Sequence, residues 1–103
     1  MEIKKINESE FNELVISSDG KILVDFYADW CGPCRMLSSV IDEVANSVDD
    51  CKFYKINVDD NKNICKKYGV MSIPTIILFE NKCEKRKNIG LISKDDLIKF
   101  INE

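Results

Sequence analysis

The chain has 103 residues and a formal net charge of −3; 45% of the residues are hydrophobic and 32% are charged. These values are typical of one globular domain, so we expect a single domain over residues 1–103. The acidic balance argues against nucleic-acid binding. Histidine is absent, which excludes hydrolases that use Cys-His or Ser-His pairs and metal enzymes with histidine ligands.

No apolar run approaches the roughly 20 residues that span a bilayer, so no membrane association is expected. The first residues also lack the long apolar core of a secretory signal. The longest apolar run, residues 76–79, has the length of a buried strand. The sequence therefore predicts a cytoplasmic location.

Strand-like and helical segments alternate along the chain. The expected elements, in order, are a strand at 3–6, a helix capped by Ser9, a strand at 22–28, a helix from about Cys34 to Val48, a strand at 53–58, a short helix at 61–68, two strands at 75–79 and 85–89 joined by a turn near Asn81, and a helix capped by Ser93. Strands separated by helices pair in parallel, whereas the last two form a hairpin. We predict an α/β fold with a mixed sheet and helices on both faces.

Two of the five cysteines, Cys31 and Cys34, are three residues apart at the junction of the central strand and the long helix. In the first turn of a helix, this spacing puts both side chains on one face, about 5–6 Å apart at Cβ. A disulfide needs roughly 3.5–4.5 Å, so a small adjustment opens or closes the bond. Gly32 permits that adjustment, and Pro33 fits the first helical turn.

The helix N-terminus also tunes the reactivity of the pair. Its free N–H groups and positive dipole end favour a thiolate at Cys31, which we expect to be exposed. Cys34 lies further inside the helix and is expected to be covered. This arrangement suits thiol–disulfide exchange, in which the first thiolate attacks a substrate disulfide and the second sulfur resolves the mixed disulfide.

Three other readings of the pair remain open: half of a zinc site, two inert buried thiols, or a static structural disulfide. Zinc would need further ligands, but Cys51, Cys65 and Cys83 are solitary and no histidine is present. We interpret these three cysteines as structural or incidental, with regulatory oxidation as the alternative.

The sequence around the cysteines resembles the thioredoxin family. The resemblance rests on residues 24–34 (Val-Asp-Phe-Tyr-Ala-Asp-Trp-Cys-Gly-Pro-Cys), 55–59 (Lys-Ile-Asn-Val-Asp), 68–70 (Tyr-Gly-Val) and 73–75 (Ile-Pro-Thr), with Phe79 and Gly90. It covers nearly the whole chain. It implies the thioredoxin fold, with a central, mostly five-stranded mixed sheet flanked by about four helices.

The resemblance assigns roles to individual residues. Cys31 is the nucleophile, Cys34 the resolving thiol, Asp25 the buried carboxylate that handles the proton of Cys34, and Lys55 the lysine near that carboxylate. Asp25 also stands out by itself, because it interrupts an apolar strand and burial would raise its pKa. The alternatives are a solvent-facing Asp25 on an edge strand and a surface Lys55.

By the same resemblance, Pro74 is a cis-proline that faces the dithiol, and Ile73 offers backbone groups to an extended substrate strand. An apolar rim that docks partners would consist of Trp30, Gly32, Pro33, Ile73, Pro74 and Gly90. The alternative for Trp30 is a core aromatic. Departures from the family are Met71 and Ser72, which would alter partner choice, and Lys82, which replaces a hairpin glycine and would strain the turn.

The sequence thus predicts a protein-disulfide oxidoreductase, specifically a cytosolic reductase of client proteins that a thioredoxin reductase re-reduces. It would be a monomer without a bound metal or organic cofactor. The uncharged Gly32-Pro33 pair favours a reductant over a strong oxidant. Two alternatives remain: an exported disulfide oxidase or isomerase, and a binding subunit in which the dithiol is unused.

Overall fold

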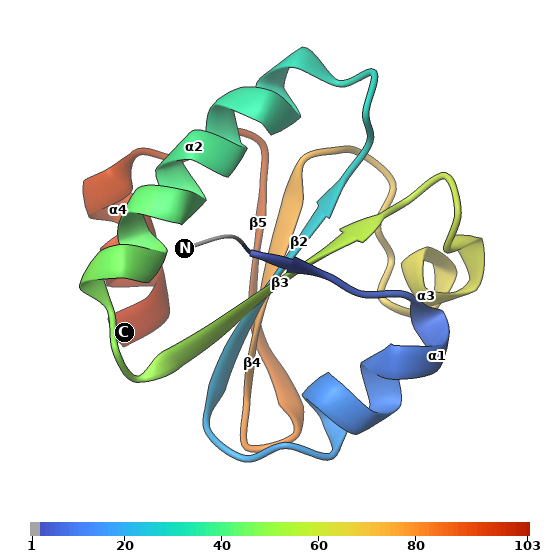
Figure 1. Cartoon of the computed structure of the whole chain (residues 1–103), viewed down its shortest axis with the longest axis horizontal. Coiled ribbons are helices and arrows are strands. Elements are labelled where there is room, and N and C mark those ends of the chain that lie inside the picture. Colours follow the sequence, from blue (N-terminus) through green and yellow to red (C-terminus); the bar gives the residue numbers. More distant parts are fainter. Residues whose placement is uncertain (1–2) are drawn as a thin grey trace.

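A five-stranded sheet forms the centre of the computed structural model, which describes residues 3–103 (Figure 1). The strands are β1 (Lys4–Lys5), β2 (Lys21–Tyr27), β3 (Cys51–Asn57), β4 (Thr75–Glu80) and β5 (Cys83–Ile89). The helices are α1 (Glu8–Phe11), which continues as the π-helical segment η1 (Asn12–Ile16), α2 (Gly32–Ser47), α3 (Lys62–Lys67) and α4 (Lys94–Asn102). The predicted order of elements is confirmed.

The sheet is mixed, as predicted. Its strand order is β1-β3-β2-β4-β5; β1, β3 and β2 run parallel, and β4 and β5 are antiparallel to their neighbours. Helices α2 and α4 cover one face, while α1, η1 and α3 cover the other (Figure 1). β2 therefore lies at the centre of the sheet with a helical layer on each side.

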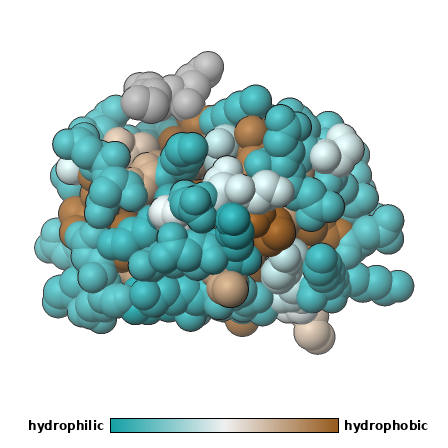
Figure 2. Space-filling view, turned by 90° about the horizontal axis from the view of Figure 1, so that it is seen from below, coloured by the Kyte–Doolittle hydropathy of each residue, from teal (hydrophilic) through white to brown (hydrophobic). Residues whose placement is uncertain are grey.

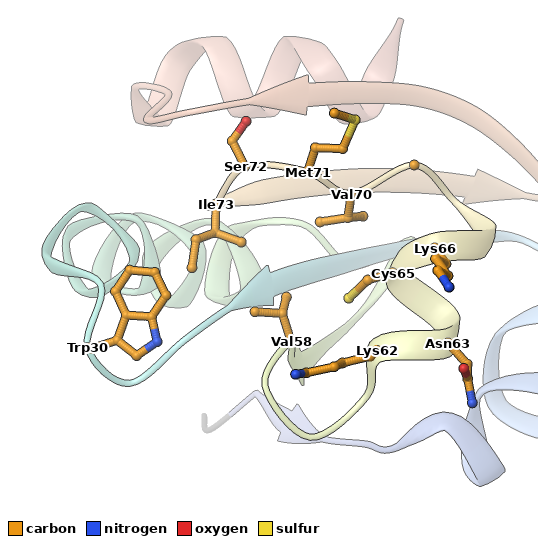
Figure 3. A pocket seen from close by; sticks show the side chains of 11 residues that line it. Trp30, Val58, Lys62, Asn63, Cys65, Lys66, Val70, Met71, Ser72 and Ile73 are labelled. Atoms are coloured by element: carbon orange, nitrogen blue, oxygen red, sulfur yellow. The ribbon is translucent and has the colours of Figure 1, made fainter.

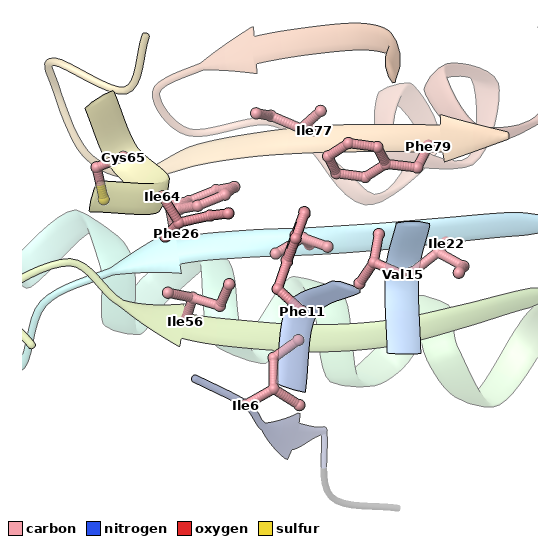
Figure 4. Packing of buried hydrophobic residues seen from close by; sticks show 11 residues of the cluster. Ile6, Phe11, Val15, Ile22, Phe26, Ile56, Ile64, Cys65, Ile77 and Phe79 are labelled. Carbon is pink, nitrogen blue, oxygen red and sulfur yellow. The ribbon is translucent and has the colours of Figure 1, made fainter. Parts of the chain in front are cut away.

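Two hydrophobic cores fill the space between the sheet and its helices. Figure 4 shows the core under α1 and α3, where Phe11 contacts the ring of Phe79 edge-on with centroids 5.5 Å apart. The second core lies under α2 and α4 and includes Leu23 and Leu37. Alternate residues of β2 enter opposite cores, which explains why its sequence is apolar at successive positions. The apolar run 76–79 is fully buried in β4, as expected.

The cap of the first helix differs from the prediction. Asn7, not Ser9, is the N-cap, and its side chain accepts a hydrogen bond from the N–H of Glu10 (3.0 Å). The side chain of Glu10 accepts a bond from the N–H of Asn7, which completes a capping box. The hydroxyl of Ser9 donates to Asn7 instead. Asn7 is preferred because only Asn7 has a Glu three residues later.

The long helix begins two residues earlier than its apolar period suggested, at Gly32 rather than Cys34. Gly32 and Pro33 contribute nothing to that period, although proline fits the first turn. The strands β3 and β5 also begin earlier, at Cys51 and Cys83 instead of residues 53 and 85, whereas β1 is shorter than the predicted residues 3–6. The cap of α4 is confirmed, since Ser93 accepts from the N–H of Asp96.

The β4–β5 hairpin turns at Asn81 and Lys82, which both have positive φ angles of 51° and 75°. The expected backbone strain at Lys82 is thus present. The end of the molecule that carries this turn is covered mostly by hydrophilic residues (Figure 2). Within residues 3–103, no helix combines the length and hydrophobicity needed to cross a membrane.

Candidate active site

The two cysteines of the motif lie where β2 ends and α2 begins. Cys31 is the N-cap of α2 and Cys34 lies in its first turn; a disulfide joins them, with Cα atoms 5.2 Å apart. The Sγ of Cys31 accepts a hydrogen bond from the backbone N–H of Cys34 (3.2 Å). After reduction, this N–H and the positive end of α2 would favour a thiolate at Cys31.

The accessibility of the pair differs from the expectation. Both residues are buried in the disulfide form, Cys31 with 5% and Cys34 with 2% of its surface exposed. Cys31 was expected to be exposed. Cys31 belongs to a small apolar cluster with Ala28 and Cys34, and Ile73 packs against this cluster. Cys31 remains the more accessible of the two sulfur-bearing residues.

Trp30 precedes the pair and is 70% exposed, which rules out a role as a core aromatic. Its indole N–H donates a hydrogen bond to Oδ2 of Asp59 (2.9 Å). The backbone N–H of Asp59 in turn donates to the side chain of the buried Asn57 (2.9 Å). A buried residue at the end of β3 therefore fixes the orientation of an apolar side chain beside the disulfide.

Pro74 follows a cis peptide bond, as expected, and is buried immediately before β4. Ile73 packs against the Cys31–Cys34 cluster, so the fold brings this segment to the disulfide from 40 residues away in the sequence. The carbonyl of Pro74 accepts a hydrogen bond from the N–H of Gly90 (2.8 Å), whose φ is +94°. Gly90 thus lies next to Pro74. Gly32 and Pro33 are exposed in the first turn of α2.

Asp25 is buried with 4% exposure, which rules out the solvent-facing alternative. Burial raises its pKa from 3.8 to about 7, and the positive charge of Lys55 lowers it in part. Its Oδ1 has no hydrogen-bond partner within residues 3–103. Asp25, Lys55 and Cys34 line a small cavity of about 140 Å³ behind the disulfide.

Lys55 is half-buried and stands opposite Asp25 in the parallel pairing of β2 with β3. Its Nζ lies 5.6 Å from the ring centroid of Tyr27, within the range of a cation–π contact. It is therefore part of the site and not a free surface lysine. The structure thus places Asp25, Cys34 and Lys55 around one cavity, and Ile73, which precedes Pro74, against the cysteine pair.

The sequence reasoning missed the polar residues that support the site. Asn57 and Asn61 are both buried, and the amide of Asn61 donates to the carbonyl of Asn57 (2.8 Å). The guanidinium of Arg35 donates to the carbonyl of Asp29 (2.9 Å), which ties α2 to the preceding loop. One signal was available: polar residues at the carboxyl end of a buried strand share the edge of the sheet that carries the dithiol.

The remaining three cysteines are not part of the disulfide. Cys51 and Cys65 are buried and Cys83 is exposed. Burial raises the pKa of the Cys51 thiol to about 12 and also raises that of Cys65. Among residues 3–103, no three histidine, cysteine, aspartate or glutamate residues cluster in a way that could hold a metal ion.

A redox-active cysteine pair at a helix N-terminus, next to a cis-proline, defines a disulfide oxidoreductase. Comparison with known proteins agrees: residues 2–103 match the sequence model of the family described as Thioredoxin. Similar proteins include thioredoxin of Rickettsia felis (46% identity, 95% of this chain and 94% of that protein) and M-type chloroplastic thioredoxin of Pisum sativum (45% identity, 93% and 56%). The chain therefore belongs to the thioredoxin family.

The predicted fold is confirmed by a solved structure, a mutant thioredoxin from Halobacterium salinarum NRC-1. It superposes with a TM-score of 0.90 at 36% sequence identity, over 98% of this chain and 88% of that one. The five-stranded sheet and its flanking helices thus form the thioredoxin fold.

Proposed function

We propose that this protein is a cytosolic thioredoxin that reduces disulfides in client proteins with its Cys31–Cys34 couple. The observation that carries the proposal is the disulfide at the N-terminus of α2, with Asp25 buried in the cavity behind it. The disulfide forms within the chain and closes a loop of only four residues. Such a bond constrains the unfolded chain little, which favours an exchange role over a structural one.

In the first step, the Cys31 thiolate of the reduced protein attacks one sulfur of a client disulfide. The client's S–S bond breaks, a mixed disulfide forms, and the second client sulfur leaves as a thiolate that takes up a proton. The N–H of Cys34 and the helix dipole stabilise the attacking thiolate.

In the second step, Cys34 gives its proton to the Asp25 carboxylate and attacks the Cys31 sulfur. The mixed disulfide breaks, the Cys31–Cys34 bond forms, and the client leaves with both of its thiols. Asp25 is suited to this role because its pKa of about 7 lets it exchange a proton near neutral pH. Lys55 would steady its negative charge. A thioredoxin reductase would then return two electrons.

We assign client docking to the apolar rim of Trp30, Gly32, Pro33, Ile73, Pro74 and Gly90. Within residues 3–103, the backbone of Ile73 has no hydrogen-bond partner. Its N–H and C=O are therefore available to an extended client segment, which would add as a strand. Pro74 would hold this backbone toward the dithiol.

Reduction of insulin by dithiothreitol, followed as turbidity, tests the proposal. The wild-type protein should accelerate precipitation, and Cys31→Ser should do no better than dithiothreitol alone. Cys83→Ser is the matched control, because it removes an exposed thiol outside the site and should retain wild-type activity. Equal activity of Cys31→Ser and wild type would refute the assignment.

The reductase is tested separately, with flavoprotein and ferredoxin-linked thioredoxin reductases supplied in parallel. One of the two should support repeated reduction of insulin without dithiothreitol. Failure of both would contradict this part of the proposal and leave the dithiol chemistry intact.

We also propose that residues 1–103 form one monomeric domain in the cytoplasm, without a bound metal or organic cofactor. A single sheet with a core on each face supports one domain. Bacterial thioredoxins among the relatives support the location. Light scattering of the purified protein and fractionation of its native cell check these statements; a dimer or a membrane fraction would contradict them.

A further inference from the structure

A groove of about 790 Å³ lies beside the disulfide, between Trp30 and helix α3 (Figure 3). Its walls are mainly apolar and include Val58, Val70 and Met71, whose side chain is 94% exposed. Ile73 lines the groove and also packs against the cysteine pair. A client strand that pairs with the backbone of Ile73 therefore passes directly into this groove.

The charged side chains that line the groove are all positive. Lys62 and Lys66 are its only charged lining residues, both from α3, and no acidic side chain lines it. Neither lysine forms an ion pair within residues 3–103. In Figure 3 the Lys62 side chain extends from α3 toward Val58 and the Trp30 end of the groove.

Within residues 3–103, the acidic residues before α3 form no ion pair with these lysines. Asp59 accepts the hydrogen bond from the Trp30 indole, and Asp60 lines a different hollow beside α1. The whole chain carries a net charge of −3, so a groove with two unpaired cations is a local exception. An apolar wall with a cationic edge is complementary to a segment that carries an apolar and an acidic side chain.

We propose that this groove selects client proteins in which an apolar residue and an aspartate or glutamate lie a few positions from the reacting cysteine. The inference rests on the proposed function and adds a substrate preference to it. Because side chains of a strand alternate, a client side chain two residues from its cysteine lies on the same face as that cysteine. This face would meet the apolar wall, and the carboxylate would reach Lys62.

The test uses the reduced full-length protein and pairs of short peptides with one disulfide. The members of each pair differ only by Glu or Gln, and the position is moved from one to four residues on either side of one cysteine. Rates of peptide reduction are followed by the fluorescence of Trp30, the only tryptophan of the chain. At one or two positions, the Glu peptide should react about two- to fivefold faster, which corresponds to one partly exposed ion pair.

Lys62→Glu should reverse this preference. Glu fits the first turn of α3 electrostatically, so the variant should fold. Lys52→Glu is the matched control, because Lys52 is exposed at the opposite end of β3 and carries the same charge change. It should keep the wild-type preference, and 0.5 M salt should weaken the preference in wild type.

Equal rates for every Glu and Gln pair in wild type would overturn the inference, as would the same preference in wild type and Lys62→Glu. In both cases the peptides are still reduced, so the proposed function stands. A folded wild-type protein that reduces none of the peptides would overturn the inference together with the function on which it rests.

Discussion

Asp25 and Cys34 line one small cavity of about 140 Å³ behind the disulfide, although they belong to different elements, β2 and α2. A cavity of this volume has room for a few water molecules. A proton can therefore pass from the thiol to the carboxylate inside the protein. We therefore predict that the second step of the proposed exchange, rather than the first, depends on Asp25.

Asp25→Asn should slow the release of the client from the mixed disulfide by roughly tenfold at pH 7, less than a general base usually contributes, because water in the cavity can accept part of the proton. The first attack should change little, since Cys31 is activated by the helix N-terminus. Stopped-flow fluorescence of Trp30 separates the two steps. Equal slowing of both steps would count against a proton relay.

The same substitution should change the pH dependence of stability. In the oxidised protein, the pKa of Asp25 is raised from 3.8 to about 7. Between these values the folded protein holds a proton that the unfolded chain has lost, so the free energy of unfolding falls as the pH rises. The difference spans about three pH units, each worth about 1.4 kcal/mol, or about 4 kcal/mol in total.

Asp25→Asn lacks this penalty, because its amide stays neutral at every pH. Its stability relative to wild type should therefore grow from pH 4 to pH 8 by up to about 4 kcal/mol. Urea unfolding of both oxidised proteins across this range measures the change. A constant difference between the two proteins would show that the pKa of Asp25 is ordinary.

Asp59→Asn should weaken the hydrogen bond that holds the Trp30 indole. A charged acceptor becomes a neutral one, and the loss of about 0.5–1.5 kcal/mol corresponds to a roughly two- to tenfold lower kcat/KM for insulin. Asp60→Asn is the control, since Asp60 is exposed and has no bond to Trp30. If both variants react alike, the orientation of Trp30 has no part in client docking.

Lys82→Gly should stabilise the protein by roughly 0.5–1 kcal/mol, because the φ of +75° is strained for a residue with a side chain. The exposed ion pair of Lys82 with Asp19 (3.8 Å) is worth little by comparison. Lys82→Ala removes the charge but keeps the strain, so it should not stabilise. The urea midpoints of the three proteins measure the change in stability. A gain in stability in Lys82→Ala would assign the effect to the lost charge.

Alkylation of the oxidised protein with iodoacetamide should label Cys83 alone. Cys83 is exposed, whereas Cys51 and Cys65 are buried and burial raises the pKa of both thiols. Mass spectrometry of the digested protein locates the label. Rapid labelling of Cys65, which lines the groove beside α3, would contradict this prediction. Modification by mild peroxide tests the regulatory alternative for all three cysteines in the same way.

Local sequence patterns determined the order of elements in this protein. Each strand and helix has a period that depends only on its own residues, so the apolar run of β4 and the cap at Ser93 could be read directly. The spacing of Cys31 and Cys34 likewise determined that the two sulfurs could meet. The ends of the elements were predicted less accurately. Asn7 rather than Ser9 is the first cap because the side chain of Glu10 accepts a hydrogen bond from the N–H of Asn7, and a pattern of apolar residues does not reveal this bond.

What lies around the disulfide was decided by the tertiary structure. Asp25 and Ile73 come from segments far apart in the sequence, and the antiparallel pairing of β2 with β4 brings Ile73 to the edge of the sheet that carries the disulfide. The pKa of Asp25 depends on its burial and on the charge of Lys55, which comes from a different strand. The cationic groove also depends on the tertiary structure, because only the folded chain places Lys62 and Ile73 on one surface.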